Sequence, residues 1–307
     1  MAIATRKSFG QALLELGGKD ERIVVLDADL SKSTMSKLFA EKYPERFFEM
    51  GISEANMIGA GAGLALSGKK PFVCSFACFV TGRYDTIRIS VAYTQAPVRI
   101  VGTHAGLGIG EDGNSQMGLE DIGLMRGLPN MNVLQPADDI ETQQAVQWMA
   151  ENDVPSYIRL TRQNVENVNG EDYTFRFGKA VELVCGDDIT IMATGGTVHH
   201  AVKAAEILQS DGINAAVVNI HTIKPLDAEA VENYARNTGH IVTVEDHNII
   251  GGLGSAVAEV IASAGVGKLT RHGLMDVFGE SGTYIDLYKK YKLDSQGIAS
   301  VVKKTLV

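Results

Sequence analysis

Short apolar runs alternate along the chain with longer segments of helical periodicity. The short runs are rich in β-branched and aliphatic residues and predict strands at residues 23–27, 71–76, 97–103 and 132–135. Helical periodicity covers residues 6–16, 54–66, 84–94, 121–126 and 140–151. Strands that alternate with helices predict an α/β fold, in which a mostly parallel sheet is flanked by helices on both faces.

This alternation stops near Asn164, in the polar and charged stretch NVENVNGEDYTFRFGKA, which contains the turn signal Asn-Gly. Alternation resumes with expected strands at 189–193, 215–220 and 241–245, and an expected helix at 198–208. We therefore expect two α/β domains, one over residues 1–168 and a smaller one over residues 176–307. The tail at 287–306 combines lysines with aliphatic residues, and we expect it to dock as a helix on the second domain.

Composition narrows the class of protein. A chain of 307 residues with 45% apolar residues can bury the cores of about two domains. Its formal charge of -9 comes from interspersed acidic and basic residues, so no basic stripe favours a nucleic acid. No signal-like segment or long apolar run is present, which predicts a cytoplasmic location. Cys74, Cys78 and Cys185 are interpreted as reduced core thiols, because neither a zinc spacing nor a disulfide framework surrounds them.

Glu54 is the first candidate for chemistry. It lies in GISEANM, at the expected start of a helix rich in glycine and alanine, where apolar surroundings favour a protonated, proton-donating carboxyl. An alternative interpretation is structural. Ser53 would then cap the helix, and Glu54 would only face the positive end of the helix dipole.

Two further segments combine residues that suit a small polar ligand. Phe76 and Phe79 follow an expected strand and either form a flat slot for an aromatic ring or belong to the core. The stretch THAGLGIGEDGNSQ surrounds His104 and Asp112 with glycines, which is typical of a ligand-binding loop. Its GxGxG spacing differs from a dinucleotide fingerprint, and GLALSGKK at 63–70 lacks the hydroxyl residue of a phosphate-binding P-loop.

Over essentially its whole length the chain resembles the C-terminal portion of transketolase, that is, the pyrimidine-binding domain followed by the C-terminal domain. The matching motifs occur in order: ATR (4–6), ADLSKST (28–34), GISEANM (51–57), SFACF (75–79), GTHAGLGIGEDGNSQM (102–117), LTRQN (160–164), TIKPLD (222–227) and VEDH (244–247).

The resemblance implies thiamine diphosphate as cofactor. Glu54 matches the carboxyl that hydrogen-bonds N1' of the aminopyrimidine, so that the ring can take the C2 proton of the thiazolium. Phe79 matches the aromatic residue under the pyrimidine, with Phe76 beside it. Asp29 matches an acidic residue close to the cofactor. Gly82 stands where some relatives place an aromatic residue near the pyrimidine.

The resemblance also implies a site for a sugar phosphate. The residues matching that site are Arg6, Ser33, His104 and Arg162, and arginine forks and hydroxyls suit phosphate oxygens. Asp112 matches the residue that reads the sugar hydroxyl beside the carbonyl, and Gln116 matches a position that polarises the carbonyl in some relatives.

Some of these positions also have a structural interpretation. Without the resemblance, Arg162 fits a solvated surface arginine, and Ser33 fits the cap of a helix through residues 35–40. His247 ends an expected strand, and we expect it to be structural.

The implied activity needs a second chain. Transketolases hold the diphosphate and its metal through an N-terminal domain with a GDG motif, and no GDG occurs here. The resemblance therefore implies an N-terminal partner subunit in an α2β2 heterotetramer, with magnesium or calcium held mainly by that partner. The implied reaction moves a two-carbon ketol unit from a ketose phosphate to an aldose phosphate, as in the pentose phosphate pathway. Three alternatives remain open: a subunit like 1-deoxy-D-xylulose-5-phosphate synthase, one like the 2-oxoacid dehydrogenase E1 beta chain, or a non-catalytic paralogue that binds partners.

Overall fold

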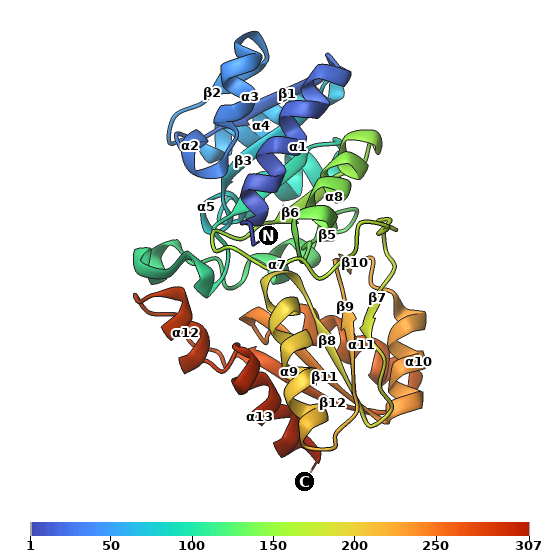
Figure 1. Cartoon of the computed structure of the whole chain (residues 1–307). Helices are drawn as coiled ribbons and strands as arrows, with labels where there is room; N and C mark the ends of the chain where they lie inside the picture. The colour runs from blue at the N-terminus through green and yellow to red at the C-terminus, as the bar shows by residue number, and fades with distance from the viewer. Residues whose placement is uncertain (1, 307) are drawn as a thin grey trace.

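A computed structural model describes residues 2–306, which form two α/β domains, one above the other in Figure 1. The first sheet has the strand order β10-β5-β6-β4-β3-β1-β2, and all its neighbours are parallel except β10, which runs antiparallel to β5. Its strands are β1 (Ile23–Asp27), β2 (Phe47–Glu49), β3 (Lys70–Phe76), β4 (Arg99–Thr103), β5 (Asn132–Leu134), β6 (Ser156–Arg159) and β10 (Thr222–Lys224).

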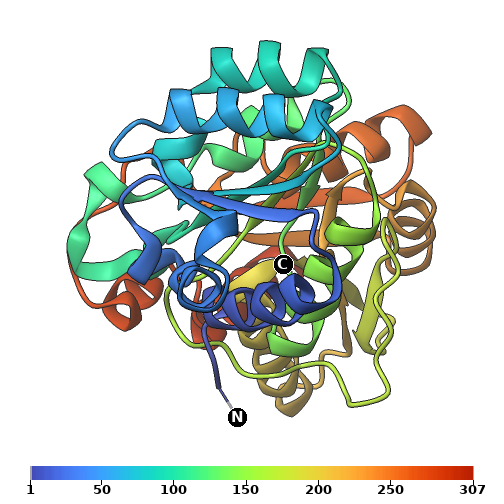
Figure 2. The same ribbon diagram turned by 90° about the horizontal axis from the view of Figure 1, so that it is seen from above.

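Helices cover both faces of this sheet (Figure 2). One face carries α1 (Thr5–Lys19) and α8 (Asp139–Glu151), and α3 (Lys37–Lys42) packs beside α1. The other face carries α4 (Glu54–Leu66), α6 (Tyr84–Ile87) and the π-helix η2 (Arg88–Tyr93). Short helices lie around the sheet: α2 (Ser31–Thr34), η1 (Pro44–Arg46), α5 (Ala77–Thr81), η3 (Leu107–Asp112), η4 (Asn114–Gln116) and α7 (Asp121–Arg126). The central strands are buried throughout, as the apolar runs predict.

The second sheet has the order β12-β11-β8-β9-β7, with only β7 antiparallel to its neighbour. Its strands are β7 (Val181–Val184), β8 (Ile189–Ala193), β9 (Ala215–Asn219), β11 (His240–Asn248) and β12 (Lys268–Leu274). The helices of this part are η5 (Gly195–Thr197), α9 (Val198–Ser210), α10 (Ala228–Thr238), α11 (Leu253–Ala264), α12 (Tyr284–Lys290) and α13 (Ser295–Leu306). The expected fold class, two mostly parallel sheets flanked by helices, is confirmed.

Two local expectations are wrong, and the one about the tail is confirmed only in part. No helix runs through residues 35–40, because Met35 has a φ of 70° and separates α2 from α3. The tail forms two helices: α13 packs on α9 of the second domain, whereas α12 lies against η3 of the first domain. Cys185 is exposed rather than in the core.

The strand β10 departs from a simple division of the chain into two sheets. It follows β9 of the second sheet in the chain but pairs with β5 of the first sheet, and so connects the two domains. Within residues 2–306, no helix has the length and apolar character needed to cross a membrane.

Candidate active site

The residues singled out in the first domain gather where neighbouring parallel strands end. Asp29 follows β1, Phe79 follows β3, His104 follows β4 and Arg162 follows β6, and these strands are adjacent in the order β6-β4-β3-β1. Ligands of open α/β sheets bind outside the carboxyl ends of such strands. The topology therefore brings these positions to one edge of the sheet.

Glu54 occupies the first position of α4 and is only 4% exposed. Its Oε2 atom lies 3.8 Å from Nη2 of Arg83, whose side chain is half exposed. Ser53 is the N-cap residue of α4, and its carbonyl accepts from the Met57 N–H, but its side chain makes no capping hydrogen bond. The alternative interpretation of Ser53 as a side-chain cap is therefore wrong. Its second half holds, because the Glu54 carboxyl lies in the first turn, at the positive end of the helix.

An aromatic stack lies beside this edge. The Phe76 and Phe79 rings are stacked with centroids 5.7 Å apart and an interplanar angle of 9°. Phe76 also stacks on His104, with centroids 3.9 Å apart. Phe76 is buried whereas Phe79 is half-buried, so Phe79 keeps part of its ring accessible. A flat accessible ring of this kind suits a heteroaromatic ligand.

His104 is held in an unusual backbone conformation and is electrically neutral. Its φ of 59° is uncommon for a residue with a side chain, and its Nδ1 lies 2.8 Å from Oγ1 of Thr103. Burial, followed by the charges of Arg6 and Arg162, lowers the pKa of His104 to about 3. The imidazole can therefore exchange hydrogen bonds with a ligand, but it carries no charge near neutral pH.

The positive charge of the site comes from Arg6 and Arg162. Nη1 of Arg6 donates to the Ser33 carbonyl, and its Nε is buried without a partner. Burial, followed by the charge of Arg162, lowers the pKa of Arg6. Nη1 of Arg162 donates to the Ile109 carbonyl at 3.0 Å and lies 3.7 Å from Oε2 of Glu111. Within residues 2–306 no carboxylate pairs with Arg6, so this cluster suits an anion.

Ser33 and Asp29 lie on the turn after β1. Ser33 is inside α2 and meets Arg6 through its carbonyl rather than its hydroxyl, so it is not the N-cap of a helix. Asp29 is exposed with a φ of 63°, and its N–H donates to Oε1 of Glu49 at 2.7 Å. The structure thus fixes Asp29 through its backbone and leaves its carboxylate exposed.

The residue that organises this turn is Asp27, which the sequence reasoning missed. Its buried carboxylate accepts from the Leu30 N–H at 2.7 Å and from the hydroxyls of Thr34 at 2.7 Å and Ser36 at 2.8 Å. Burial raises the pKa of Asp27 to about 6, and the Thr34 hydroxyl opposes that shift. The signal was present in the sequence, where an acidic residue ends an apolar strand and several hydroxyl residues follow. These bonds also explain why the expected helix breaks at Met35.

Asp112 and Gln116 belong to the glycine-rich loop that follows His104. The loop closes at its base, where Ala105 pairs with Gly118. Asp112 is exposed at the end of η3 and makes no side-chain hydrogen bond to another described residue, whereas Gln116 is half-buried and its carbonyl accepts from the Cys78 thiol. Their carboxylate and amide are therefore free to meet a ligand.

His247 lies away from these residues, buried between the two domains. Its Nδ1 lies 2.6 Å from the Asn248 carbonyl, and its Nε2 accepts the N–H of Gly123 in α7 at 3.4 Å. Burial lowers its pKa to about 4. The histidine thus joins the domains as a neutral side chain. Within the described residues, no group of three or more His, Cys, Asp or Glu side chains is placed to hold a metal ion.

The chain matches two protein families in succession. Residues 1–167 match the transketolase pyrimidine-binding domain, and residues 178–298 match the transketolase C-terminal domain. A protein from Methanocaldococcus jannaschii named as a transketolase C-terminal section is 49% identical over 305 residues, which cover 98% of this chain and 96% of that protein.

Two further matches are of the same length. A 6-deoxy-6-sulfo-D-fructose transketolase subunit from a Clostridium species is 42% identical and covers 95% of this chain and 91% of its own. A solved structure described as a split-gene transketolase in an inactive beta4 tetramer is 46% identical, with a TM-score of 0.92, and covers 99% of this chain and 98% of that chain. The chain belongs to the transketolase family, of which it carries the pyrimidine-binding and C-terminal domains.

Proposed function

We propose that this chain is the C-terminal subunit of a split transketolase, which moves a two-carbon ketol unit between sugars that carry an anionic group. The observation that carries the proposal is the position of His104. One face of its ring stacks on Phe76, and the charges of Arg6 and Arg162 act on the same imidazole. A site for an aromatic ring and a site for an anion are thus joined through one side chain.

The residues at the aromatic stack fit the pyrimidine end of thiamine diphosphate. Glu54 is buried at a helix start, where its carboxyl would hydrogen-bond a ring nitrogen, and the accessible Phe79 would support the ring from below. Asp29, on the neighbouring turn, would lie close to the cofactor. The cofactor, when bound, supplies the carbon nucleophile of ketol transfer. The diphosphate and its magnesium or calcium ion would be held mainly by a partner subunit.

The remaining residues would bind the sugar. Arg6 and Arg162 carry the charge for the terminal anion, and Ser33 fixes Arg6 through its carbonyl. His104 is neutral and would exchange hydrogen bonds with a sugar oxygen near the reacting carbon. Asp112 would accept from the hydroxyl beside the carbonyl, and the Gln116 amide would donate to the carbonyl oxygen.

The partner would be a separately encoded N-terminal subunit, in an α2β2 assembly. Relatives of nearly the same length are named as a section or a subunit, and the split-gene tetramer made of beta chains is described as inactive. We therefore expect this chain alone to be inactive.

Reconstitution tests the proposal. The chain is mixed with the N-terminal transketolase subunit of its own genome, thiamine diphosphate and magnesium, and ketol transfer to ribose 5-phosphate is measured. Xylulose 5-phosphate and 6-deoxy-6-sulfo-D-fructose serve as donors, because the arginine cluster suits a phosphate or a sulfonate. We expect activity with at least one donor in the mixture and none in either subunit alone. A stable, cofactor-loaded complex that transfers no ketol unit from either donor would contradict the proposal and favour a binding role.

A further inference from the structure

The glycine-rich loop at residues 105–118 is held from the second domain by one buried carboxylate. Asp246 of β11 is fully enclosed, and its Oδ1 accepts from the Leu107 N–H at 2.8 Å. Its Oδ2 faces the Gly108 N–H at 3.4 Å. Asp246 therefore caps the start of η3 across 139 residues of sequence, as an N-cap residue caps its own helix.

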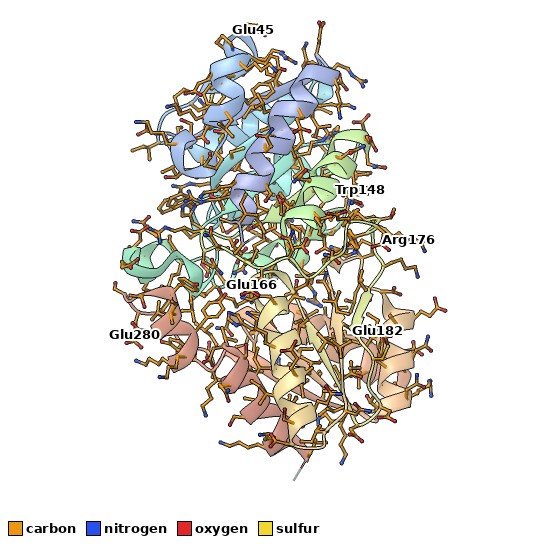
Figure 3. All side chains as sticks on the ribbon, viewed as in Figure 1. Glu45, Trp148, Glu166, Arg176, Glu182 and Glu280 are labelled. Atoms are coloured by element: carbon orange, nitrogen blue, oxygen red, sulfur yellow. The ribbon has the colours of Figure 1, made fainter. Side chains whose placement is uncertain are left out.

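Tyr288 completes this contact from α12. Its hydroxyl donates to Oδ2 of Asp246 at 2.9 Å and accepts from Nε2 of Gln163 at 3.1 Å. Gln163 follows Arg162, which bonds the Ile109 carbonyl of the same loop. Figures 1 and 2 show α12 directly beside η3, and Figure 3 marks Glu280 just before this helix. The loop is thus fixed by hydrogen bonds from both domains.

The glycines of the loop make this close approach possible. A Cβ at Gly106 would collide with the Asp246 carboxylate, and Gly106 also has a φ of 78°. A Cβ at Gly108 would collide with the Gln163 amide. Position 106 therefore suits only glycine, and a side chain at Gly108 would have to displace the Gln163 amide from its bond with Tyr288.

We propose that Asp246 and Tyr288 are positioning residues for the substrate site, through their hold on the loop that carries Asp112 and Gln116. The inference rests on the proposed function of those two residues. It assigns the second domain a part in shaping the substrate site, because both residues belong to that domain and reach the loop of the first. Loss of the Tyr288 hydroxyl would loosen η3 without removing a group that meets the sugar.

Amide hydrogen exchange tests the hold on the loop without any substrate. The full-length Tyr288→Phe variant is compared with the wild type by exchange of peptides covering residues 105–118. We expect the Leu107 and Gly108 amides to exchange about 3- to 10-fold faster, as the loss of one buried hydrogen bond predicts. Tyr234→Phe is the matched control, because it removes another hydroxyl bonded to a carboxylate, that of Glu182, elsewhere in the second domain.

Kinetics in the reconstituted complex then separate positioning from a purely structural role. Tyr288→Phe should raise KM for the sugar donor about 3- to 10-fold while thiamine diphosphate affinity stays at the wild-type value. Asp246→Asn should act in the same direction and more strongly, because an amide group cannot accept the same three bonds.

Unchanged amide exchange at residues 105–118 in both Tyr288→Phe and Asp246→Asn would overturn the inference. A lower denaturation midpoint with unchanged KM would overturn it too, because that result describes a structural residue only. If the wild-type complex transfers no ketol unit, the proposed function fails, and the exchange data alone still decide whether Asp246 and Tyr288 hold the loop.

Discussion

The neutral state of His104 decides how the anion end of the site works. Its ring is packed against Phe76 and lies near two guanidinium groups, so a third positive charge there is unfavourable. In the proposed site, the two arginines would therefore carry the full positive charge that attracts a phosphate or sulfonate. A histidine with a lowered pKa also leaves a signature in stability, because the folded chain binds fewer protons than the unfolded chain at acidic pH.

His104→Gln tests that signature. The pKa of His104 lies at about 3 in the folded protein, below its ordinary value of 6.5, so its contribution to the unfolding free energy falls as the pH drops below 6.5. The variant lacks this contribution, so its unfolding free energy should fall by about 2 kcal/mol less than that of the wild type between pH 7.5 and pH 5. Urea unfolding at both pH values measures the difference. Equal losses in the two proteins would mean that His104 titrates normally.

Arg162→Ala tests the anion site itself. The side chain is 40% exposed, so its removal should cost little stability, but it removes a charged partner of the sugar's anionic group. We expect KM for a phosphorylated donor to rise about 10- to 100-fold in the reconstituted complex. KM for the same ketose without its phosphate should rise far less, because that substrate loses only the contact by which Arg162 holds the Ile109 carbonyl of the loop. Arg176→Ala, an exposed arginine in the segment between the domains, is the control and should leave both constants unchanged (Figure 3).

At the scale of elements, α4 carries Glu54 and is seated on β3 by a glycine. A Cβ at Gly61 would lie 2.7 Å from Cγ1 of Val73, so the helix can approach the strand only with glycine at this position. Gly63, two residues later on the same helix, has open space around the corresponding point. The two glycines therefore have opposite roles although the sequence shows them as equivalent.

Paired substitutions separate these roles. Gly61→Ala should lower the unfolding free energy of the chain by about 1–3 kcal/mol through overpacking. Gly63→Ala should raise it by about 0.5–1 kcal/mol, because alanine favours the helix. Adding Val73→Ala to Gly61→Ala should recover part of the loss. Urea midpoints measure all three, and a stabilising Gly61→Ala would show that α4 sits farther from β3 than described.

Sequence patterns predict those elements that are determined mainly by the burial of apolar residues. The buried strands β1, β3 and β4 follow directly from their apolar runs, and α7 has the expected bounds at residues 121–126. The break at Met35 could not be predicted from periodicity, because it depends on hydroxyl bonds to the buried Asp27 carboxylate. Likewise, the segment at 84–94 continues as a π-helix after Ile87, which no apolar spacing indicates.

At the scale of the whole molecule, the two sheets are joined by contacts that connect distant parts of the sequence. The buried Arg159 donates to the Asp121 carboxylate at 2.9 Å and to the carbonyls of Gly118 and Asp246. The Asn219 amide of β9 donates to Glu141 of α8, and β10 joins the first sheet. Family motifs locate most candidate site residues in the sequence, but not these connections, because each depends on partners that only the fold brings together.

At the same scale, the proposed function divides the site between two chains. The described residues of this chain offer a carboxyl, an aromatic stack and an arginine cluster, but no group of three or more His, Cys, Asp or Glu side chains placed to hold a metal ion. We therefore propose that Glu54 governs proton transfer at the cofactor once a partner subunit completes the site.

Deuterium exchange at C2 of thiamine diphosphate, followed by NMR after acid quench, measures the proton transfer assigned to Glu54. We expect fast exchange in the complex of this chain with the N-terminal subunit, and exchange at the rate of the free cofactor with this chain alone. Glu54→Gln should assemble normally and exchange at least about 100-fold more slowly than the wild-type complex. Exchange at the wild-type rate in an assembled Glu54→Gln complex would show that Glu54 does not govern this proton transfer.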